Sequence, residues 1–157
     1  MLRAAIFTLS DSRRLETDDS GRIMATMLRE AGHEVEAHEV LREDPEAVLR
    51  RLRSAGRNPR LDMLLINGGT GITSRDRTVE VVSAVLERTL PGFGEIFRAL
   101  SYRQIGPAAM ASRAVAGVFM KKLVFCTPGS PGAVRLAMER LILPGASHLV
   151  GELRKGS

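Results

Sequence analysis

The sequence is poor in the residue types that support several common kinds of chemistry. Its 157 residues include one cysteine, three histidines and no tryptophan. Because a lone Cys126 cannot form an internal disulfide, we expect a cytoplasmic protein. Cys126 lies at the end of an apolar segment and is better explained as a small buried side chain than as a nucleophile. His33, His38 and His148 lack the spacing of a histidine metal site.

Scarce aromatics and the lack of long apolar runs exclude two further classes of partner. Aromatic residues make up 4% of the chain, too few for a base-stacking surface, and the basic residues are scattered. No run of 18 apolar residues exists, and the N-terminus resembles a strand rather than a signal peptide. We expect neither a nucleic-acid partner nor a membrane segment. The formal net charge of +5 also suits binding of a small polyanion.

Familiar catalytic motifs are missing too. The chain has no Gly-x-x-x-x-Gly-Lys-Ser/Thr motif, so it is not a Walker-type ATPase. The segment Gly68–Gly71 does not match the dinucleotide-binding Gly-x-Gly-x-x-Gly pattern. Ser130 lies in Pro-Gly-Ser-Pro-Gly, which is not the nucleophile elbow of a serine hydrolase.

Short apolar segments alternate with helical patterns along the chain. Strands are predicted at residues 3–10, 33–41, 61–67, 114–119 and 123–127, and helices near residues 23–32, 45–56, 78–86, 96–105, 133–141 and 146–153. This order predicts an α/β fold, a three-layer αβα sandwich with a mostly parallel, doubly wound sheet. The last two strands should form an antiparallel hairpin at one edge. We expect one domain over residues 1–157.

Local signals predict where some elements begin and end. Asp19 is placed to cap the first helix, and Pro91–Gly94 is predicted to be a turn. Pro144 and Gly145 are expected to separate the last two helices. Residues 33–41 alternate between charged and apolar side chains, which is typical of a half-exposed edge strand.

A Gly-rich turn follows the apolar third strand and is the strongest candidate for a binding site. In Gly68-Gly-Thr-Gly71, bare backbone N–H groups can face an anion just before a helix that begins at Thr78. The loops after Leu9 and Cys126 should meet it, because parallel strands end at one edge. The alternative is that the glycines only form a tight connection.

Acidic residues near this turn favour a metal-bridged phosphate. Asp76 follows the turn and would repel phosphate unless a cation such as Mg²⁺ lay between them, although it could instead cap the helix at Thr78. Glu43 and Asp44 either supply a second carboxylate or simply begin a helix. Arg75 beside Asp76 either neutralises phosphate or lies in solvent.

Several short motifs occur in an order that resembles a known family. They are Ser10-Asp11, Asn67-Gly-Gly-Thr-Gly71 with Arg75-Asp76, Pro91-Gly-Phe-Gly-Glu95, Ser112-Arg113 with Ala116-Gly117, and Pro128-Gly129-Ser130-Pro131. Together they span nearly the whole chain and resemble the molybdopterin-binding family, specifically the stand-alone MogA/MoaB type of molybdopterin adenylyltransferase. The resemblance implies a role in molybdenum cofactor biosynthesis, by Mg²⁺-dependent transfer of AMP from ATP to molybdopterin with release of pyrophosphate.

The resemblance also implies roles for particular residues. Asp76, Glu43 and Asp44 would be catalytic, and Asp76 and Asp44 would bind the metal. Substrate and nucleotide contacts would come from Ser10, Asp11, Gly68, Gly69, Thr70, Gly71, Arg75, Ser112, Pro128, Gly129 and Ser130. A homotrimer or hexamer is implied, with the molybdate-inserting enzyme as a candidate partner.

The sequence departs from the family pattern at two positions. Glu43 stands where the family commonly has aspartate, unless the alignment shifts onto Asp44, and Val79 replaces a proline in the next helix. Since a glutamate is one methylene longer, metal geometry at this position would differ. The alternative function is therefore a non-catalytic molybdopterin-binding carrier or scaffold of the same pathway.

Overall fold

The computed structural model describes residues 1–156, which form one mixed six-stranded sheet between helices. The strands are β1 (Arg3–Leu9), β2 (Glu34–Leu41), β3 (Met63–Asn67), β4 (Arg88–Thr89), β5 (Val115–Phe119) and β6 (Lys122–Thr127). The α-helices are α1 (Asp19–Glu30), α2 (Pro45–Gly56), α3 (Thr78–Val85), α4 (Pro91–Ile105), α5 (Pro131–Ala137) and α6 (Leu143–Lys155). Shorter turns of helix are η1 (Leu15–Thr17), η2 (Gly106–Ala111) and the π-helical η3 (Met138–Ile142).

The sheet has the order β2-β1-β3-β6-β5-β4, in which the first four strands are parallel. The predicted hairpin of β5 and β6 is present and antiparallel. It does not form the sheet edge, however, because β4 pairs with the outer side of β5. The two residues of β4 are exposed and too few to show a strand periodicity in the sequence. The predicted α/β fold is confirmed, and the edge position of the hairpin is corrected.

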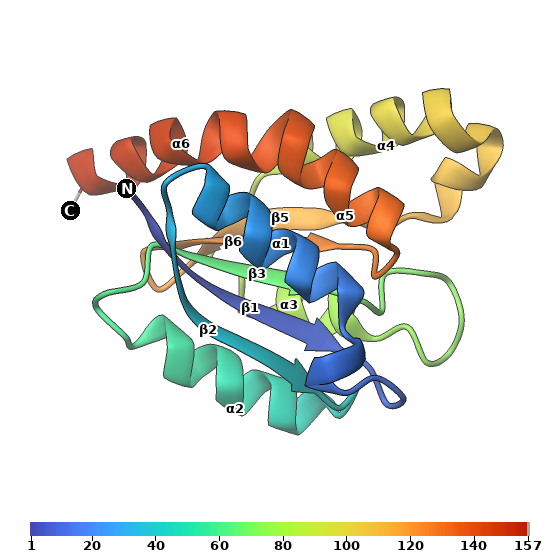
Figure 1. Ribbon diagram of the computed structural model, residues 1–157, viewed down its shortest axis with the longest axis horizontal. Coiled ribbons are helices and arrows are strands. Elements are labelled where there is room, and N and C mark those ends of the chain that lie inside the picture. Colours follow the sequence, from blue (N-terminus) through green and yellow to red (C-terminus); the bar gives the residue numbers. More distant parts are fainter. Residues whose placement is uncertain (157) are drawn as a thin grey trace.

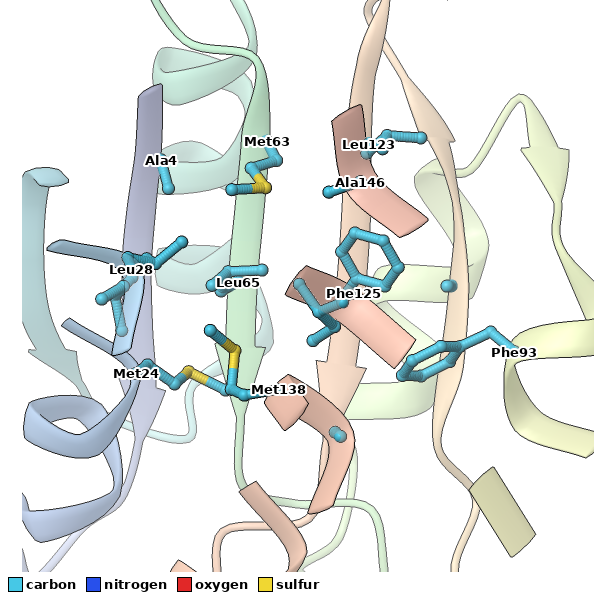
Figure 2. Close-up of a cluster of buried hydrophobic side chains, with 14 of the residues drawn as sticks. Ala4, Met24, Leu28, Met63, Leu65, Phe93, Leu123, Phe125, Met138 and Ala146 are labelled. Carbon is cyan, nitrogen blue, oxygen red and sulfur yellow. The ribbon is translucent and has the colours of Figure 1, made fainter. Parts of the chain in front are cut away.

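Helices cover both faces of the sheet (Figure 1). Alternate residues along the central strands point to opposite faces, so that Ile6 and Leu65 pack beneath α1 and α4–α6 whereas Phe7 and Leu64 pack against α2 and α3. Figure 2 shows the first of these clusters, with labelled side chains from the sheet and from its covering helices: Ala4, Met24, Leu28, Met63, Leu65, Phe93, Leu123, Phe125, Met138 and Ala146. The central strands are buried on both faces, which explains their continuous apolar runs.

Three local predictions are wrong. Asp18, not Asp19, caps α1, and its carboxylate accepts from the backbone N–H of Gly21. Pro91 begins α4 instead of a turn, because proline fits the first helical turn, where its missing N–H is not needed. Pro144 does not separate two helices: the π-helical turn η3 joins α5 to α6. Its wider backbone accommodates a proline that an unbroken α-helix would resist.

The half-exposed edge strand predicted for residues 33–41 is confirmed, since β2 pairs on one side only and its residues are all partly exposed. Within residues 1–156, no helix is long and apolar enough to span a membrane.

Candidate functional site

The three predicted loops meet at the carboxyl edge of the parallel strands. Gly68 donates its backbone N–H to the carbonyl oxygen of Thr127 at 3.0 Å, which ties the turn after β3 to the end of β6. A side chain at Gly68 would place its Cβ 2.4 Å from the carbonyl oxygen of Leu9, at the end of β1. A Cβ on Gly129 would lie 3.2 Å from the Cα of Gly68. Glycine is therefore required for the loops to approach this closely.

A cleft of about 280 Å³ opens at this edge. It is lined by many of the residues predicted to form the site: Gly69, Thr70, Gly71, Asp76, Ser112, Pro128, Gly129 and Ser130. Residues more than 60 positions apart in the sequence thus share one cavity. Among the described residues, the buried hydroxyl of Ser112 has no hydrogen-bond partner, so a polar ligand atom in the cleft could satisfy it.

Sequence reasoning missed one wall of this cleft. Phe97, Ser101 and Ile105 of α4 line the cleft together with the Gly-rich turn, as do Ala111 and Ala133. Their helical spacing is the same as that of an ordinary core stripe, and Phe97 does also pack in the core. Only the packed structure shows that part of this stripe faces the cleft.

Asp76 is held in a tight turn at the mouth of the cleft. Its Oδ2 accepts hydrogen bonds from the backbone N–H and the hydroxyl of Thr73, at 2.9 Å and 2.6 Å. The hydroxyl hydrogen bond is the main cause that lowers the pKa of Asp76, so its carboxylate is ionised at neutral pH. Asp76 does not cap α3, whose N-cap is Arg77 without a side-chain hydrogen bond. The alternative role of Asp76 as a helix cap is therefore wrong.

The charge of Asp76 acts on the carboxyl group of Glu43. Burial, followed by the negative charges of Asp11 and Asp76, raises the pKa of Glu43. The backbone N–H of Glu43 also donates to Asp11 Oδ1 at 3.1 Å. Asp44 instead caps α2, where its Oδ1 accepts from the N–H of Glu46 at 3.3 Å. The charges of Asp11 and Asp76 therefore act on Glu43.

The carboxylates of Asp76 and Glu43 would suit a divalent cation that a bound ligand also coordinates. They are less suited to a cation held by protein side chains alone. Within residues 1–156, no group of three or more His, Cys, Asp or Glu side chains could hold a metal ion. Mg²⁺ typically takes one or two carboxylates and completes its shell with water and substrate phosphates. Asp76 and Glu43 would suit that arrangement, because after burial the charges of Asp11 and Asp76 raise the pKa of Glu43, and a cation beside these carboxylates would relieve that repulsion.

Arg113 belongs to the Ser112-Arg113 motif noted in the sequence, but no role was predicted for it. Its guanidinium donates to the carbonyl oxygens of Gly71 and Asp76, at 2.8 Å and 2.9 Å, and pairs with the carboxylate of Glu80. Its backbone N–H donates to the carbonyl oxygen of Thr70 at 3.1 Å. One side chain therefore joins both ends of the loop that presents Asp76. The order Ser-Arg in the sequence contains no signal of these contacts.

A buried polar network lies beneath the Gly-rich turn. Asn67 Nδ2 donates to Thr8 Oγ1 at 2.8 Å, and Thr8 Oγ1 donates to Asp18 Oδ2 at 2.6 Å. His38 Nε2 lies 2.7 Å from the same carboxylate oxygen. The network links β3, β1, the start of α1 and the edge strand β2, so it fixes the position of the turn that follows Asn67.

The remaining predicted residues lie beside the cleft. Ser10 and Asp11 line a neighbouring hollow of about 460 Å³ together with Arg13, Arg14 and Arg42. The linings of the hollow and the cleft are in contact, because Arg13 Nη1 donates to the carbonyl oxygen of Gly129 at 3.1 Å. Ser10 organises its own loop by accepting the N–H of Arg13 at 3.0 Å. The last predicted residues are Arg75, exposed on the loop before Asp76, and Gly68, buried at its stem.

The interpretation of Cys126 as a core residue is confirmed. Its side chain is fully buried, and burial raises the pKa of its thiol to about 12. A thiol in this state is neither ionised nor accessible at neutral pH. Cys126 therefore belongs to the core and not to the site.

These features define a doubly wound α/β protein with an open, acid-bearing cleft at the carboxyl ends of its parallel strands. Comparison with known proteins identifies the family within this class. Residues 5–148 match the family model described as "Probable molybdopterin binding domain". The chain belongs to this molybdopterin-binding domain family.

Relatives and solved structures agree with this family. Molybdenum cofactor biosynthesis protein B of Bacillus subtilis is 47% identical over 156 residues, which cover 99% of this chain and 92% of the relative. A crystal structure of a molybdenum cofactor biosynthesis protein B has a TM-score of 0.95 at 47% identity, over 98% of this chain and 96% of that one. The tungsten cofactor synthesizing protein MoaB from Pyrococcus furiosus has a TM-score of 0.87 at 32% identity, over 98% and 97% of the two chains.

Proposed function

We propose that this protein acts in molybdenum cofactor biosynthesis and transfers AMP from ATP to molybdopterin. Membership of the molybdopterin-binding family and the names of the relatives support the pathway. The observation that carries the reaction is the ionised carboxylate of Asp76, held by Thr73 beside the Gly-rich turn in a cleft that two further polar loops line.

The proposed reaction exchanges one phosphoanhydride for another. An oxygen of the terminal phosphate of molybdopterin attacks the α-phosphorus of ATP, the bond from that phosphorus to the bridging oxygen of the β-phosphate breaks, and pyrophosphate leaves. A phosphate oxygen is already ionised, so no side chain is needed to remove a proton from the nucleophile. The contribution of the protein is alignment and neutralisation of charge, which dominate catalysis of phosphoryl-type transfers.

The residues of the cleft fit these tasks. The backbone of Gly69 and Gly71 lines the cleft without side chains, so phosphate oxygens can approach the chain closely. The apolar wall from α4 suits the planar part of an organic ligand, and the unpaired hydroxyl of Ser112 suits a polar atom on it. Asp76 and Glu43 would hold Mg²⁺ together with the phosphates, and the ion would supply neutralisation of phosphate charge.

A non-catalytic carrier is the competing function. It is favoured by the position of Asp44, whose carboxylate is engaged as the cap of α2, and by the raised pKa of Glu43. A carrier would bind molybdopterin in the same cleft but would release no pyrophosphate. The two functions therefore separate in a single assay.

The assay measures pyrophosphate release by the purified protein with Mg-ATP and molybdopterin. We expect release that depends on molybdopterin and falls at least about 100-fold in Asp76→Asn. Asp19→Asn, which alters an exposed carboxylate at the start of α1, is the matched control and should retain the wild-type rate. Molybdopterin binding without pyrophosphate release would support the carrier, and release that is unchanged in Asp76→Asn would refute the proposed mechanism.

A trimeric or hexameric assembly remains a prediction. Phe93 and Phe97 of α4 lie in the core of the protein itself, but Ile96 and Ile105 on α4 and Met110 on η2 are 50–81% exposed. These side chains are available to a second copy of the chain. Light scattering at micromolar concentration tests this prediction, which a monomer would contradict.

A further inference from the structure

A second pocket lies at the opposite end of the sheet, where β6 begins. It has a volume of about 330 Å³ and is lined by Pro59, Leu61, Asp62, Met120, Lys121, Lys122, Val150, Leu153 and Arg154. The pocket combines the segment before β3, the turn of the β5–β6 hairpin and the last turns of α6. It shares no lining residue with the cleft at the carboxyl edge.

Lys122 is the unusual residue in this pocket. It is 6% exposed, and no acceptor within residues 1–156 forms a hydrogen bond or ion pair with its ammonium group. Burial lowers the pKa of Lys122, an effect that the charge of Asp62 opposes. The ammonium nitrogen of Lys122 is not one of the buried polar atoms, so its stem is covered while its charged end reaches the solvent of the pocket.

The only carboxylate among the lining residues is already engaged. Asp62 accepts a 2.7 Å hydrogen bond from Arg154 Nη2 and a 2.9 Å hydrogen bond from the backbone N–H of Arg3. Its charge is therefore matched by Arg154. Lys121 and Lys122 are left as two positive charges on the same pocket, without a carboxylate of their own among the described residues.

The hairpin turn sets the positions of these lysines. Met120 and Lys121 both have positive φ angles, 48° and 61°, which is the backbone of a two-residue type I′ turn. Residues other than glycine rarely adopt such φ angles, and Asn or Gly is usual at both positions of this turn. Here the turn carries a methionine and a lysine on the wall of a pocket, where Asn-Gly would have formed the hairpin more easily.

We propose that this pocket binds a small organic phosphate monoester. The two lysines, which form no ion pair among the described residues, complement a phosphate dianion, and an ammonium on the wall of the pocket can form a charge-assisted hydrogen bond with a phosphate oxygen. Leu61, Met120 and Val150 supply an apolar surface for the organic part of the ligand. The pocket is a separate site, and its existence does not depend on the reaction proposed for the cleft.

The probes are phenyl phosphate, which carries both the charge and an apolar group, inorganic phosphate, which carries the charge alone, and phenol, which carries the apolar group alone. Binding is followed by NMR of the protein labelled with ¹³C at its methionine methyl groups. Met120 reports on the pocket, and Met110 reports on the region of the cleft, because it precedes the lining residue Ala111. We expect phenyl phosphate to shift the Met120 signal at millimolar or lower concentration and to bind at least about tenfold tighter than either partial probe.

The critical variant is Lys122→Leu, which removes the charge and keeps an apolar stem. We expect it to weaken phenyl phosphate binding at least about tenfold. Lys155→Leu removes an exposed lysine that pairs with Glu152 near the same end of the molecule, and it should bind within about twofold of the wild type. Because leucine keeps the covered apolar stem of Lys122, a folding failure is not expected, and the melting temperature without ligand checks this.

Three results would overturn the proposal. The Met120 signal could be unmoved by phenyl phosphate up to about 10 mM, a concentration at which weak specific binding is visible. Lys122→Leu could bind phenyl phosphate as tightly as the wild type does. Phenyl phosphate could also bind no tighter than inorganic phosphate, which would remove the organic monoester as the class of ligand.

Discussion

Arg113 and Gly71 are joined by a 2.8 Å hydrogen bond from the guanidinium Nε to the carbonyl oxygen. The same guanidinium reaches the carbonyl oxygen of Asp76 at 2.9 Å, so the loop between these residues is closed at both ends. A Cβ on Gly71 would lie 2.8 Å from Asp76 Oδ2, which shows how tightly the loop folds over its own carboxylate. The position of Asp76 in the cleft depends on a residue of another loop.

Arg113→Lys should reduce the rate of pyrophosphate release at least about tenfold, because a lysine cannot bond two carbonyl oxygens and a carboxylate in one plane. The loss should appear in kcat more than in the binding of molybdopterin. Arg77→Lys, at an exposed arginine of the same segment, is the matched control. Steady-state kinetics of the two variants test this prediction, and a wild-type rate for Arg113→Lys would contradict it.

Glu43→Gln should have opposite effects on stability and activity. The pKa of Glu43 is raised above its usual 4.5, first by burial and then by Asp11 and Asp76, so the folded protein holds a proton that the unfolded chain has lost. This group therefore makes the protein less stable as the pH rises above about 4.5. Without Mg²⁺, Glu43→Gln should be more stable than the wild type at pH 7, and its rate of pyrophosphate release should fall about tenfold or more.

Urea denaturation with a chelator, at pH 4 and pH 7, measures the effect on stability. The gain in the free energy of unfolding should be present at pH 7 and absent at pH 4, where Glu43 is protonated in the wild type. Glu139→Gln on η3 is an exposed control. A gain that is equal at both pH values would show that charge at Glu43 is not its cause.

Asp18→Asn should destabilise the protein in a pH-dependent way. Burial would raise the pKa of Asp18, but the hydrogen bonds from Thr8, His38 and Gly21 together outweigh it and lower the pKa below its usual 3.8. The stability that the ionised carboxylate contributes is therefore present above about pH 4 and is lost as the pH falls below this value. We expect Asp18→Asn to lower the free energy of unfolding by about 1–3 kcal/mol at pH 7.

The difference between Asp18→Asn and the wild type should shrink at pH 3, as measured by urea denaturation. Asp19→Asn is the control, because it removes a neighbouring carboxylate at the start of α1 whose side chain is exposed. A difference that persists unchanged at pH 3 would assign the effect to shape rather than to charge.

Gly68→Ala should destabilise the protein by at least about 2 kcal/mol, because the residue has a φ of +108° and its Cβ would collide with the backbone of Leu9. Gly145→Ala, in α6 with open space around it, should instead stabilise by about 0.5–1 kcal/mol. Melting temperatures of the two variants give the comparison. Equal melting temperatures would show that the turn can relax away from β1.

The central strands and the Gly-rich turn could be predicted because their signals are local. Residues 63–66 are apolar without interruption, and Asn67 connects them directly to Gly68, so the pattern contains both the buried strand and its end. The edge strand β2 could be recognised from alternating side chains alone. By contrast, β4 has two exposed residues and exists only because β5 offers it an unpaired side.

Other features of the site could not be predicted because they depend on contacts between distant segments. The cap of α1 is Asp18 rather than Asp19 because the carboxylate of Asp18 is held by Thr8 and His38 from two strands. Likewise, the cleft-lining residues of α4 and Arg113 are 26–43 positions along the chain from the residues of the Gly-rich loop with which they share the cleft or a hydrogen bond.

By itself, the sequence determined the α/β class, the central strands, the glycines that allow three loops to touch and the acidic residue beside them. These are properties of short segments, set by side-chain size, backbone freedom and periodicity. Only the tertiary structure decided which residues share the cleft, that Asp44 caps a helix while Glu43 lies near Asp76, and that Lys122 lines a pocket at the far end with its stem covered. Such properties arise from the distances between side chains of different elements, and these distances exist only once the sheet is assembled.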